Sequence, residues 1–134
     1  MVRLEIVTPE AKTFSDNVDS VVIPGVEGEL GVLPMHAPMM TLLEPGELRV
    51  MKNGEETRLA VGEGFVEITQ EKIAVLTDMA VKESDIDEAA ADEAIRRAEE
   101  AMRGERMSDE EQATTKAALM RSLALIKVKR RRQV

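Results

Sequence analysis

The glycine-rich segment 25–31 is the first candidate for chemistry, because closely spaced glycines can wrap backbone N–H groups around a phosphate. A phosphate-binding loop ends in Gly-Lys-Ser or Gly-Lys-Thr and leads into a helix, and this segment has neither feature. We therefore expect Gly25, Gly28 and Gly31 to form bends and tight turns between strands.

The single histidine, His36, lies between Pro34 and Pro38 and is the candidate general base. Base catalysis needs a positioned partner and a nucleophile. The neighbouring residues supply neither, so we expect a structural or interface role. The carboxylates of residues 85–100 are spread over an exposed helical face, and the chain has no cysteine, so we expect no metal site. The sequence thus predicts a protein with no catalytic residues of its own.

The strongest charge pattern lies near the C-terminus. Residues 112–134 contain seven Lys and Arg and no acidic residue, whereas residues 83–111 contain four basic and twelve acidic residues. Nucleic acid, anionic lipid headgroups or an acidic protein surface would each suit such a segment, as would a solvated tail at a helix C-terminus. The net charge of −8 and the absence of Trp and Tyr disfavour nucleic acid. An acidic protein surface fits best.

The elements that position these residues change character near residue 82. Val and Ile number 16 in residues 1–82 and five in residues 83–134, whereas Ala numbers five and ten. Residues that favour strands therefore give way to residues that favour helices. We predict a β domain over residues 1–82 and a helical domain over residues 83–134.

Short alternating segments separated by turns fill the first domain. Val2, Leu4 and Ile6 alternate with charged residues, and Asn53-Gly54 is a strong hairpin signal. No long helical period interrupts the strands, so parallel βαβ units are disfavoured. The short antiparallel strands favour an N-terminal antiparallel β-sandwich or a small barrel, with strands near residues 2–6, 21–23, 39–43, 48–50, 57–61, 66–68 and 73–77.

The sequence of the second domain predicts a C-terminal antiparallel two-helix hairpin. Ser84 with Asp87 and Ser108 with Glu111 resemble capping boxes, and Gly104 ends the first helix. Alanines in the seam bury little area, so we expect a weakly held hairpin that can open or re-dock. The predicted apolar stripes are Ile86, Ala90, Ala94 or Ile95, Ala98 and Met102 in the first helix, and Ala113, Ala117, Met120 and Ala124 in the second.

The beginning of the chain lacks the features of a signal peptide, and no apolar run reaches the ~20 residues that span a bilayer. Together with the absence of cysteine, this predicts an intracellular protein without direct bilayer insertion.

Residues 26–43, followed by Pro45-Gly46, resemble the signature of the epsilon subunit of F-type ATP synthases of bacteria or organelles. The family pattern is Gly-x-Leu-Gly, a short gap, His-Ala-Pro, an apolar strand and a glycine turn. Here it corresponds to residues 28–31, 36–38, 39–43 and 45–46. The similarity extends over the whole chain, and the family fold is a β-sandwich followed by two helices.

This resemblance implies a non-catalytic subunit of the central stalk, part of the rotor that couples ion flow to ATP synthesis. Its partners would be the gamma subunit and the ring of c subunits, on the cytoplasmic side of an energy-transducing membrane. Glu29 and His36, within the matching turns, would lie near the rotor contacts and serve in docking.

The resemblance also implies that the helices can extend toward the beta and alpha subunits and inhibit ATP hydrolysis. The basic residues that would face acidic loops of the beta subunits are Arg121, Lys127, Lys129, Arg130, Arg131 and Arg132. The alternatives are an ATP-sensing helical module and a purely structural adaptor between gamma and the c ring.

No cofactor is required by this assignment. Some family members bind ATP through Ile/Leu-Asp-x-x-Arg-Ala, which implies Ile86, Asp87 and Ala91 as candidate ATP-binding residues. Arg97, or its neighbour Arg96, is the candidate for a partial substitute for the motif arginine. Ala90 occupies the position of that arginine, and the loss of a charge-assisted hydrogen bond weakens the expected binding.

Overall fold

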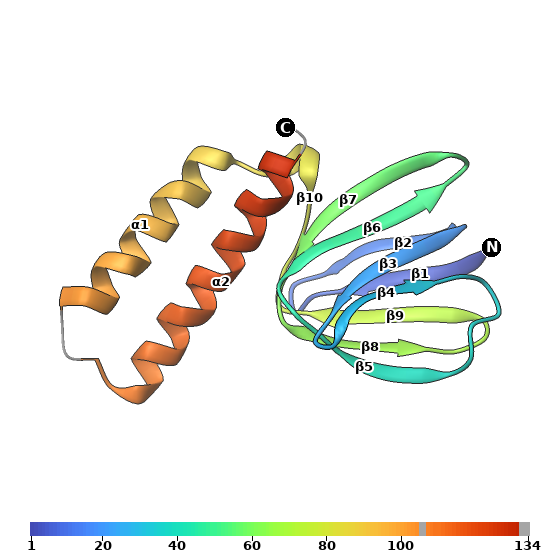
Figure 1. Cartoon of the computed structure of the whole chain (residues 1–134), viewed down its shortest axis with the longest axis horizontal. Helices are drawn as coiled ribbons and strands as arrows, with labels where there is room; N and C mark the ends of the chain where they lie inside the picture. The colour runs from blue at the N-terminus through green and yellow to red at the C-terminus, as the bar shows by residue number, and fades with distance from the viewer. Residues whose placement is uncertain (105–106, 132–134) are drawn as a thin grey trace.

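The computed structural model describes residues 1–104 and 107–131, with ten strands followed by helices (Figure 1). The strands are β1 (Val2–Val7), β2 (Lys12–Val18), β3 (Ser20–Gly25), β4 (Gly28–Val32), β5 (Met39–Leu43), β6 (Gly46–Lys52), β7 (Glu55–Val61), β8 (Gly64–Ile68), β9 (Lys72–Thr77) and β10 (Ala80–Lys82). The helices are a short 3-10 helix η1 (Glu83–Asp85), α1 (Glu88–Gly104) and α2 (Asp109–Arg131).

The strands form one continuous hydrogen-bonded network in the order β10-β7-β6-β3-β5-β8-β9-β1-β2, with β4 paired to β3. Among these described strands every pair is antiparallel except β1 with β9, which run parallel. The predicted β-sandwich followed by two helices is confirmed, and the parallel pair is an addition that the sequence did not predict. In Figure 1 the helices lie side by side at one end of the sandwich.

Aliphatic side chains fill the core of the sandwich. Leu4 and Ile6 of β1, Ile23 of β3 and Leu48 of β6 are fully buried, while residues between them on the strands are more exposed. This alternation follows from the strand geometry, in which successive side chains point to opposite faces. Phe14 also packs against this core, but it is only partly buried.

The helix boundaries confirm one predicted cap and correct the other. Ser108 Oγ accepts the N–H of Glu111 at 3.1 Å, as the second capping box predicts. The first helix does not begin at Ser84, because residues 83–85 form η1 and Ile86 is extended. Its cap is Asp87, whose Oδ1 accepts the N–H of Ala90 at 3.0 Å.

The predicted apolar stripes are partly wrong. In α1 the buried residues are Ala91 and Ala98, whereas Ala90, Ala94 and Met102 are exposed. Of the predicted stripe, Ile86 and Ala98 are buried and the alternative Ile95 is half-buried, so these positions are confirmed, and Ala91 is a buried residue that the stripe missed.

Helix α2 buries two opposite sides, which is why a single stripe does not describe it. Val128 packs in a cluster with the sandwich residue Ala60, while Ser122 and Ile126 are buried on the other side of the helix. The helix contacts α1 along its length and also β6 and β7. Of the residues predicted for its stripe, Ala124 is buried, Ala117 is partly buried, and Ala113 and Met120 are exposed.

Candidate functional site

The outer surface of β5, β8 and β9 exposes large apolar side chains. Leu42, Phe65 and Leu76 are consecutive register partners across the three strands, and they are 60%, 40% and 39% exposed. Their chain neighbours Leu43 and Val66 point to the core and are buried. We call the following exposed residues the apolar face: Val26, Met40, Leu42, Phe65 and Leu76.

A groove of about 720 Å³ runs over the apolar face. Its walls come from residues of β5 and β8 and from the turn after β3, among them Val26, Met39, Met40, Leu42 and Phe65. Contiguous exposed apolar surface on a small protein marks a protein–protein interaction site. This surface is therefore suited to bind another protein chain.

The turn after β4 places His36 and presents two further apolar side chains. The N–H of His36 donates to Leu33 O at 3.3 Å, and Met35 between them has a φ of 68°. A left-handed conformation at a non-glycine residue costs about 1–2 kcal/mol and persists where the surroundings impose it. Leu33 and Met35 are 65% and 76% exposed at the tip of this turn.

The His36 ring is used to hold that turn. Its Nδ1 lies 2.7 Å from Ala37 O and donates to it, and the side chain is partly buried. This contact is local and provides no nucleophile for base catalysis, and the structural or interface role of His36 stays a prediction.

Glu29 is exposed on β4, at the opposite end of this strand from His36. Its Oε2 lies 3.4 Å from Nη1 of Arg49 on β6. The same nitrogen lies 3.3 Å from Oε1 of Glu47, a buried carboxylate on β6. The structure thus places Glu29 in an ion-pair network, which the sequence did not predict.

Several of the predicted inhibitory residues are engaged within the chain. Arg121 Nη1 lies 3.3 Å from Asp78 Oδ2 in the sandwich, and Lys129 Nζ donates to Glu83 O at 3.3 Å. Arg130 contacts two carboxylates of α1, with Nε 3.3 Å from Glu88 and Nη2 2.8 Å from Asp92. These contacts hold α2 against the sandwich, η1 and α1.

The other predicted basic residues differ in their surroundings. Lys127 is exposed and forms no ion pair with any residue that the structure describes. Arg131 is the last residue of α2, and Arg132 lies outside the described residues. Lys127 is therefore accessible to a partner in the folded arrangement.

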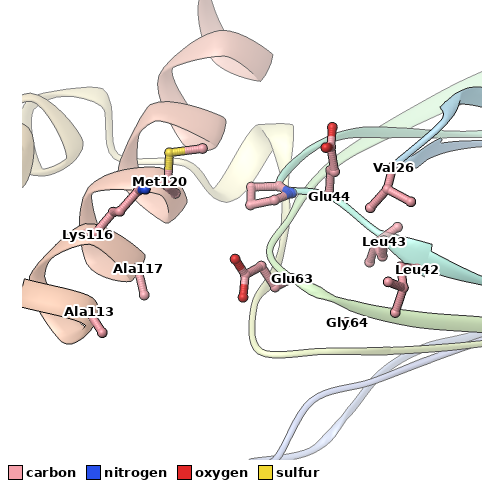
Figure 2. A pocket seen from close by; sticks show the side chains of 11 residues that line it. Val26, Leu42, Leu43, Glu44, Glu63, Gly64, Ala113, Lys116, Ala117 and Met120 are labelled. Carbon is pink, nitrogen blue, oxygen red and sulfur yellow. The ribbon is translucent and has the colours of Figure 1, made fainter. Parts of the chain in front are cut away.

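A small apolar cluster docks α2 on the sandwich. Val128 is fully buried with Ala60 of β7 and Ile86 beside η1, and it is joined by the partly buried Met79, Val81 and Leu125. The N-terminal half of α2 lies farther from the sandwich than its C-terminal half (Figure 1). Figure 2 shows the open groove of about 760 Å³ between them, with Lys116, Ala117 and Met120 on the helix facing Glu63 and the apolar residues of β5.

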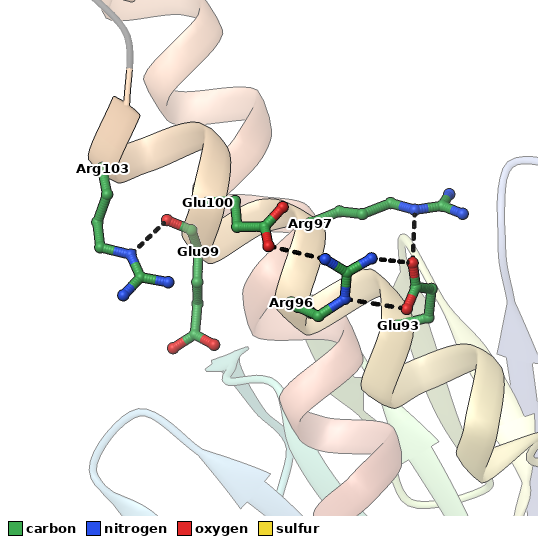
Figure 3. A network of polar contacts seen from close by, with 6 residues as sticks. All are labelled: Glu93, Arg96, Arg97, Glu99, Glu100 and Arg103. Carbon is green, nitrogen blue, oxygen red and sulfur yellow. Dashed lines mark hydrogen bonds and ion pairs between the residues drawn. The ribbon is translucent and has the colours of Figure 1, made fainter.

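The candidate ATP-binding residues have local structural roles. Ile86 and Ala91 are buried in packing contacts, and Asp87 caps α1. Arg97 is exposed, with Nε donating to Glu93 Oε1 at 3.2 Å in the network of Figure 3. The Arg96 guanidinium, together with Arg97, holds the pKa of the Glu93 carboxyl below its usual range. The weakened ATP binding expected of this group stays a prediction.

Residues 1–104 and 107–131 contain neither a metal-binding cluster nor a helix that could span a membrane. No group of three or more His, Asp or Glu side chains there is arranged to hold a metal ion. No helix in the same part of the chain combines the length and hydrophobicity needed to cross a membrane.

Two family models match the chain. Residues 1–83 match the ATP synthase delta/epsilon chain beta-sandwich domain, and residues 84–130 match the ATP synthase delta/epsilon chain long alpha-helix domain. The chain is 42% identical to the ATP synthase epsilon chain of Herpetosiphon aurantiacus over 135 residues, which cover 98% of each protein. It is 49% identical to the ATP synthase epsilon chain of Pelotomaculum thermopropionicum over 98 residues, 73% of each protein.

Solved structures share the fold. A chain of the Euglena gracilis mitochondrial ATP synthase (OSCP/F1/c-ring, rotational state 1) superposes with a TM-score of 0.76 at 22% identity, covering 92% of this chain and 78% of that one. A chain of the Tetrahymena thermophila mitochondrial ATP synthase (central stalk/c-ring) gives a TM-score of 0.62 at 12% identity, covering 96% of both.

Proposed function

This chain belongs to the ATP synthase delta/epsilon family, as an epsilon subunit of the F-type enzyme, and on that premise we propose that it docks the rotor through its apolar face. The epsilon subunit is a non-catalytic subunit, which agrees with the absence of a catalytic site in the sequence prediction. We propose the gamma subunit and the c-subunit ring as its partners, on the cytoplasmic side of the membrane where ion flow drives ATP synthesis.

The apolar face is the observation that supports this proposal best. Leu42, Phe65 and Leu76 form one exposed row, and Leu42 and Phe65 also line a groove whose walls are mostly apolar side chains. In the sequence, Glu29 and the turn before β5 lie close to the residues of this surface. We propose that Glu29 supplies a polar docking group and that the exposed turn residues Leu33 and Met35 supply apolar ones. The related structures from Euglena and Tetrahymena contain a c-ring, which supports the choice of partner.

The interface is tested by a charge placed on the apolar face. Leu42→Glu is expected to weaken binding of purified gamma subunit by about 100-fold, because it puts a carboxylate at the centre of an apolar contact. Met102→Glu on α1 is the matched control, since Met102 is 44% exposed and lies outside the face. Equal affinities for wild type and Leu42→Glu, measured by calorimetry, would refute the proposed interface.

We also propose that the hairpin restrains ATP hydrolysis when it leaves the sandwich. In the folded arrangement Arg121, Lys129 and Arg130 are engaged within the chain, so they must be released before they can contact the beta subunits. Lys127 needs no such release. The adaptor alternative predicts instead that the hairpin has no effect on hydrolysis.

The inhibitory role requires a variant that leaves docking intact. Truncation after Leu125 removes Val128, and so it changes docking as well as charge. Lys127→Gln removes only an exposed charge and is expected to raise ATP hydrolysis by the assembled enzyme, measured with the ion gradient dissipated. Lys116→Gln, also exposed on α2, is the control. Unchanged hydrolysis in both Lys127→Gln and the truncation would favour the adaptor.

A further inference from the structure

A methionine side chain lies open to solvent within the apolar face. Met40 is 63% exposed on β5 and lines the groove over this face. On the same face of β5 its neighbour is Leu42, two residues along the strand. The register partner of Met40 on β8 is Glu67, so Phe65 is its diagonal neighbour on that strand. The thioether of Met40 is therefore part of the surface that is proposed to bind the rotor.

Two methionines line the groove, and they differ in exposure. Met39 is 39% exposed, whereas Met40 is 63% exposed. Met35, in the turn before β5, is 76% exposed but lies outside the residues that line the groove. Met40 is therefore the methionine that combines high exposure with a place in the apolar face.

An exposed thioether is a target for peroxides. The O–O bond of the peroxide breaks and an S–O bond forms, so that the sulfur loses two electrons and the peroxide is reduced to water or an alcohol. The sulfoxide product is polar, whereas the thioether is an apolar side chain that adapts to its neighbours. Burial of a polar group is unfavourable unless it gains a hydrogen bond. A sulfoxide in the apolar face therefore opposes the docking of a partner on that face.

We propose that Met40 is a site of reversible oxidation by peroxides, and that its sulfoxide weakens the attachment of this subunit to the rotor. The effect on attachment rests on the proposed function, in which the gamma subunit covers the apolar face. Bound gamma shields the sulfur from peroxide, and oxidation of the sulfur disfavours the binding of gamma. A subunit that is oxidised before assembly is kept out of the rotor until a thiol-dependent reductase restores the thioether.

The first test uses the isolated full-length chain with hydrogen peroxide and needs no partner. Mass spectrometry with peptide fragmentation follows the sulfoxide at each methionine. Met79 is the reference for low access, because it is half-buried in the cluster under α2. Met40 is expected to oxidise about tenfold faster than Met79, because susceptibility follows exposure. Equal rates at these two residues would overturn the proposal.

Protection by the partner is the second measurement. Saturating gamma subunit is expected to slow the oxidation of Met40 about tenfold, because the bound partner removes the sulfur from solvent. Met102 is the matched control in the same sample, since it is 44% exposed and lies on α1, outside the apolar face. Its rate is expected to stay unchanged. A constant rate at Met40 in the gamma complex would overturn the shielding of this residue.

The effect on docking is measured by calorimetry, as the ratio of the dissociation constants for gamma after and before peroxide. The expected ratio is about ten for wild type and for Met102→Leu, because each keeps the oxidisable sulfur of Met40. The expected ratio for Met40→Leu is close to one, whatever the starting affinity of this variant. Reduction of oxidised wild type by reductases for both sulfoxide epimers is expected to restore the untreated affinity. A ratio near ten for Met40→Leu would overturn the assignment to Met40.

Failure of the proposed function is distinguishable from failure of this inference. If the untreated wild-type chain does not bind gamma, the proposed function is contradicted, and the effect of the sulfoxide on docking falls with it. If the untreated chain binds gamma and oxidation of Met40 leaves the affinity unchanged, this inference alone is overturned.

Discussion

The docking of the helical hairpin depends on Val128, and Val128→Ala tests this dependence. Val128 is fully buried against Ala60 and Ile86. The substitution removes two carbon atoms from this contact, at about 0.8 kcal/mol each, so the transfer contribution is about 1.6 kcal/mol. The methyl group of Ala60 is too short to fill the space that Val128→Ala would leave. The remaining cavity therefore adds to the transfer contribution.

A loss of this size shifts the docking equilibrium about 15-fold toward the open form, because about 1.4 kcal/mol corresponds to a factor of ten. The expected result is faster hydrogen exchange at the α2 amides of residues 121–128, with unchanged exchange in β1 and β9. Leu123→Ala is the matched control on the same helix. Leu123 is 43% exposed, so removing more carbon atoms there is expected to have a smaller effect.

Two outcomes would refute this account of docking. Exchange in Val128→Ala that matches wild type would mean that the apolar cluster does not hold the helix. Acceleration of β1 and β9 together with α2 would mean that the hairpin and the sandwich unfold as one unit, so that docking is not a separate equilibrium.

Three further predictions concern pH, packing and nucleotide binding. Hydrogen bonds from Lys12 and Lys72 lower the pKa of Glu5 from 4.5 to about 2. Its contribution to stability is therefore complete above pH 4.5 and is lost as the pH falls toward about 2, so Glu5→Gln is expected to reduce the acid dependence of the urea midpoint over this range. Gly64→Ala is expected to destabilise the sandwich by about 2 kcal/mol in thermal unfolding, because a Cβ would lie 1.8 Å from Leu76 O. Calorimetry with millimolar ATP is expected to show no heat for the wild-type chain, and binding in that experiment would show that Ala90 does not prevent it.

The strands that could be predicted from the sequence are those with alternating aliphatic residues. Strand β2 lacks this signal, because Val18 is its buried residue and the rest of the strand is polar or half-buried. Its conformation is imposed by pairing with β1. The parallel pairing of β1 with β9 joins segments about 70 residues apart, and no local pattern encodes such a contact.

The first helix cap shows how tertiary packing selects between local signals. Ser84 and Asp87 are both acceptable N-caps by residue type. Ile86 lies between them, and it is extended and buried in the cluster with Val128. The helix therefore begins after Ile86, and Asp87 becomes the cap.

The sequence contains a signal for the apolar face, but it is not the alternation of apolar and polar residues that predicts a strand. Residues 39–43 are Met-Met-Thr-Leu-Leu, which places apolar side chains on both faces of one strand. A strand that is apolar on both faces is covered on both. One face lies on the core, so the other predicts a partner. The Glu29–Arg49–Glu47 network had no comparable signal, because it joins β4 to β6 across β3.

The energetics of docking fit a hairpin that responds to its partners. The ion pairs of Arg121 and Arg130 are partly exposed, and such pairs contribute about 0–1 kcal/mol each. The apolar cluster centred on Val128 is small, and each of its buried side chains contributes about 1.5–3 kcal/mol at most. A two-state equilibrium is inverted from 1:99 to 99:1 by about 5.5 kcal/mol of differential binding. The proposed inhibitory role therefore requires neighbouring subunits to supply differential binding of about this size before the basic side chains that hold the folded hairpin can contact them.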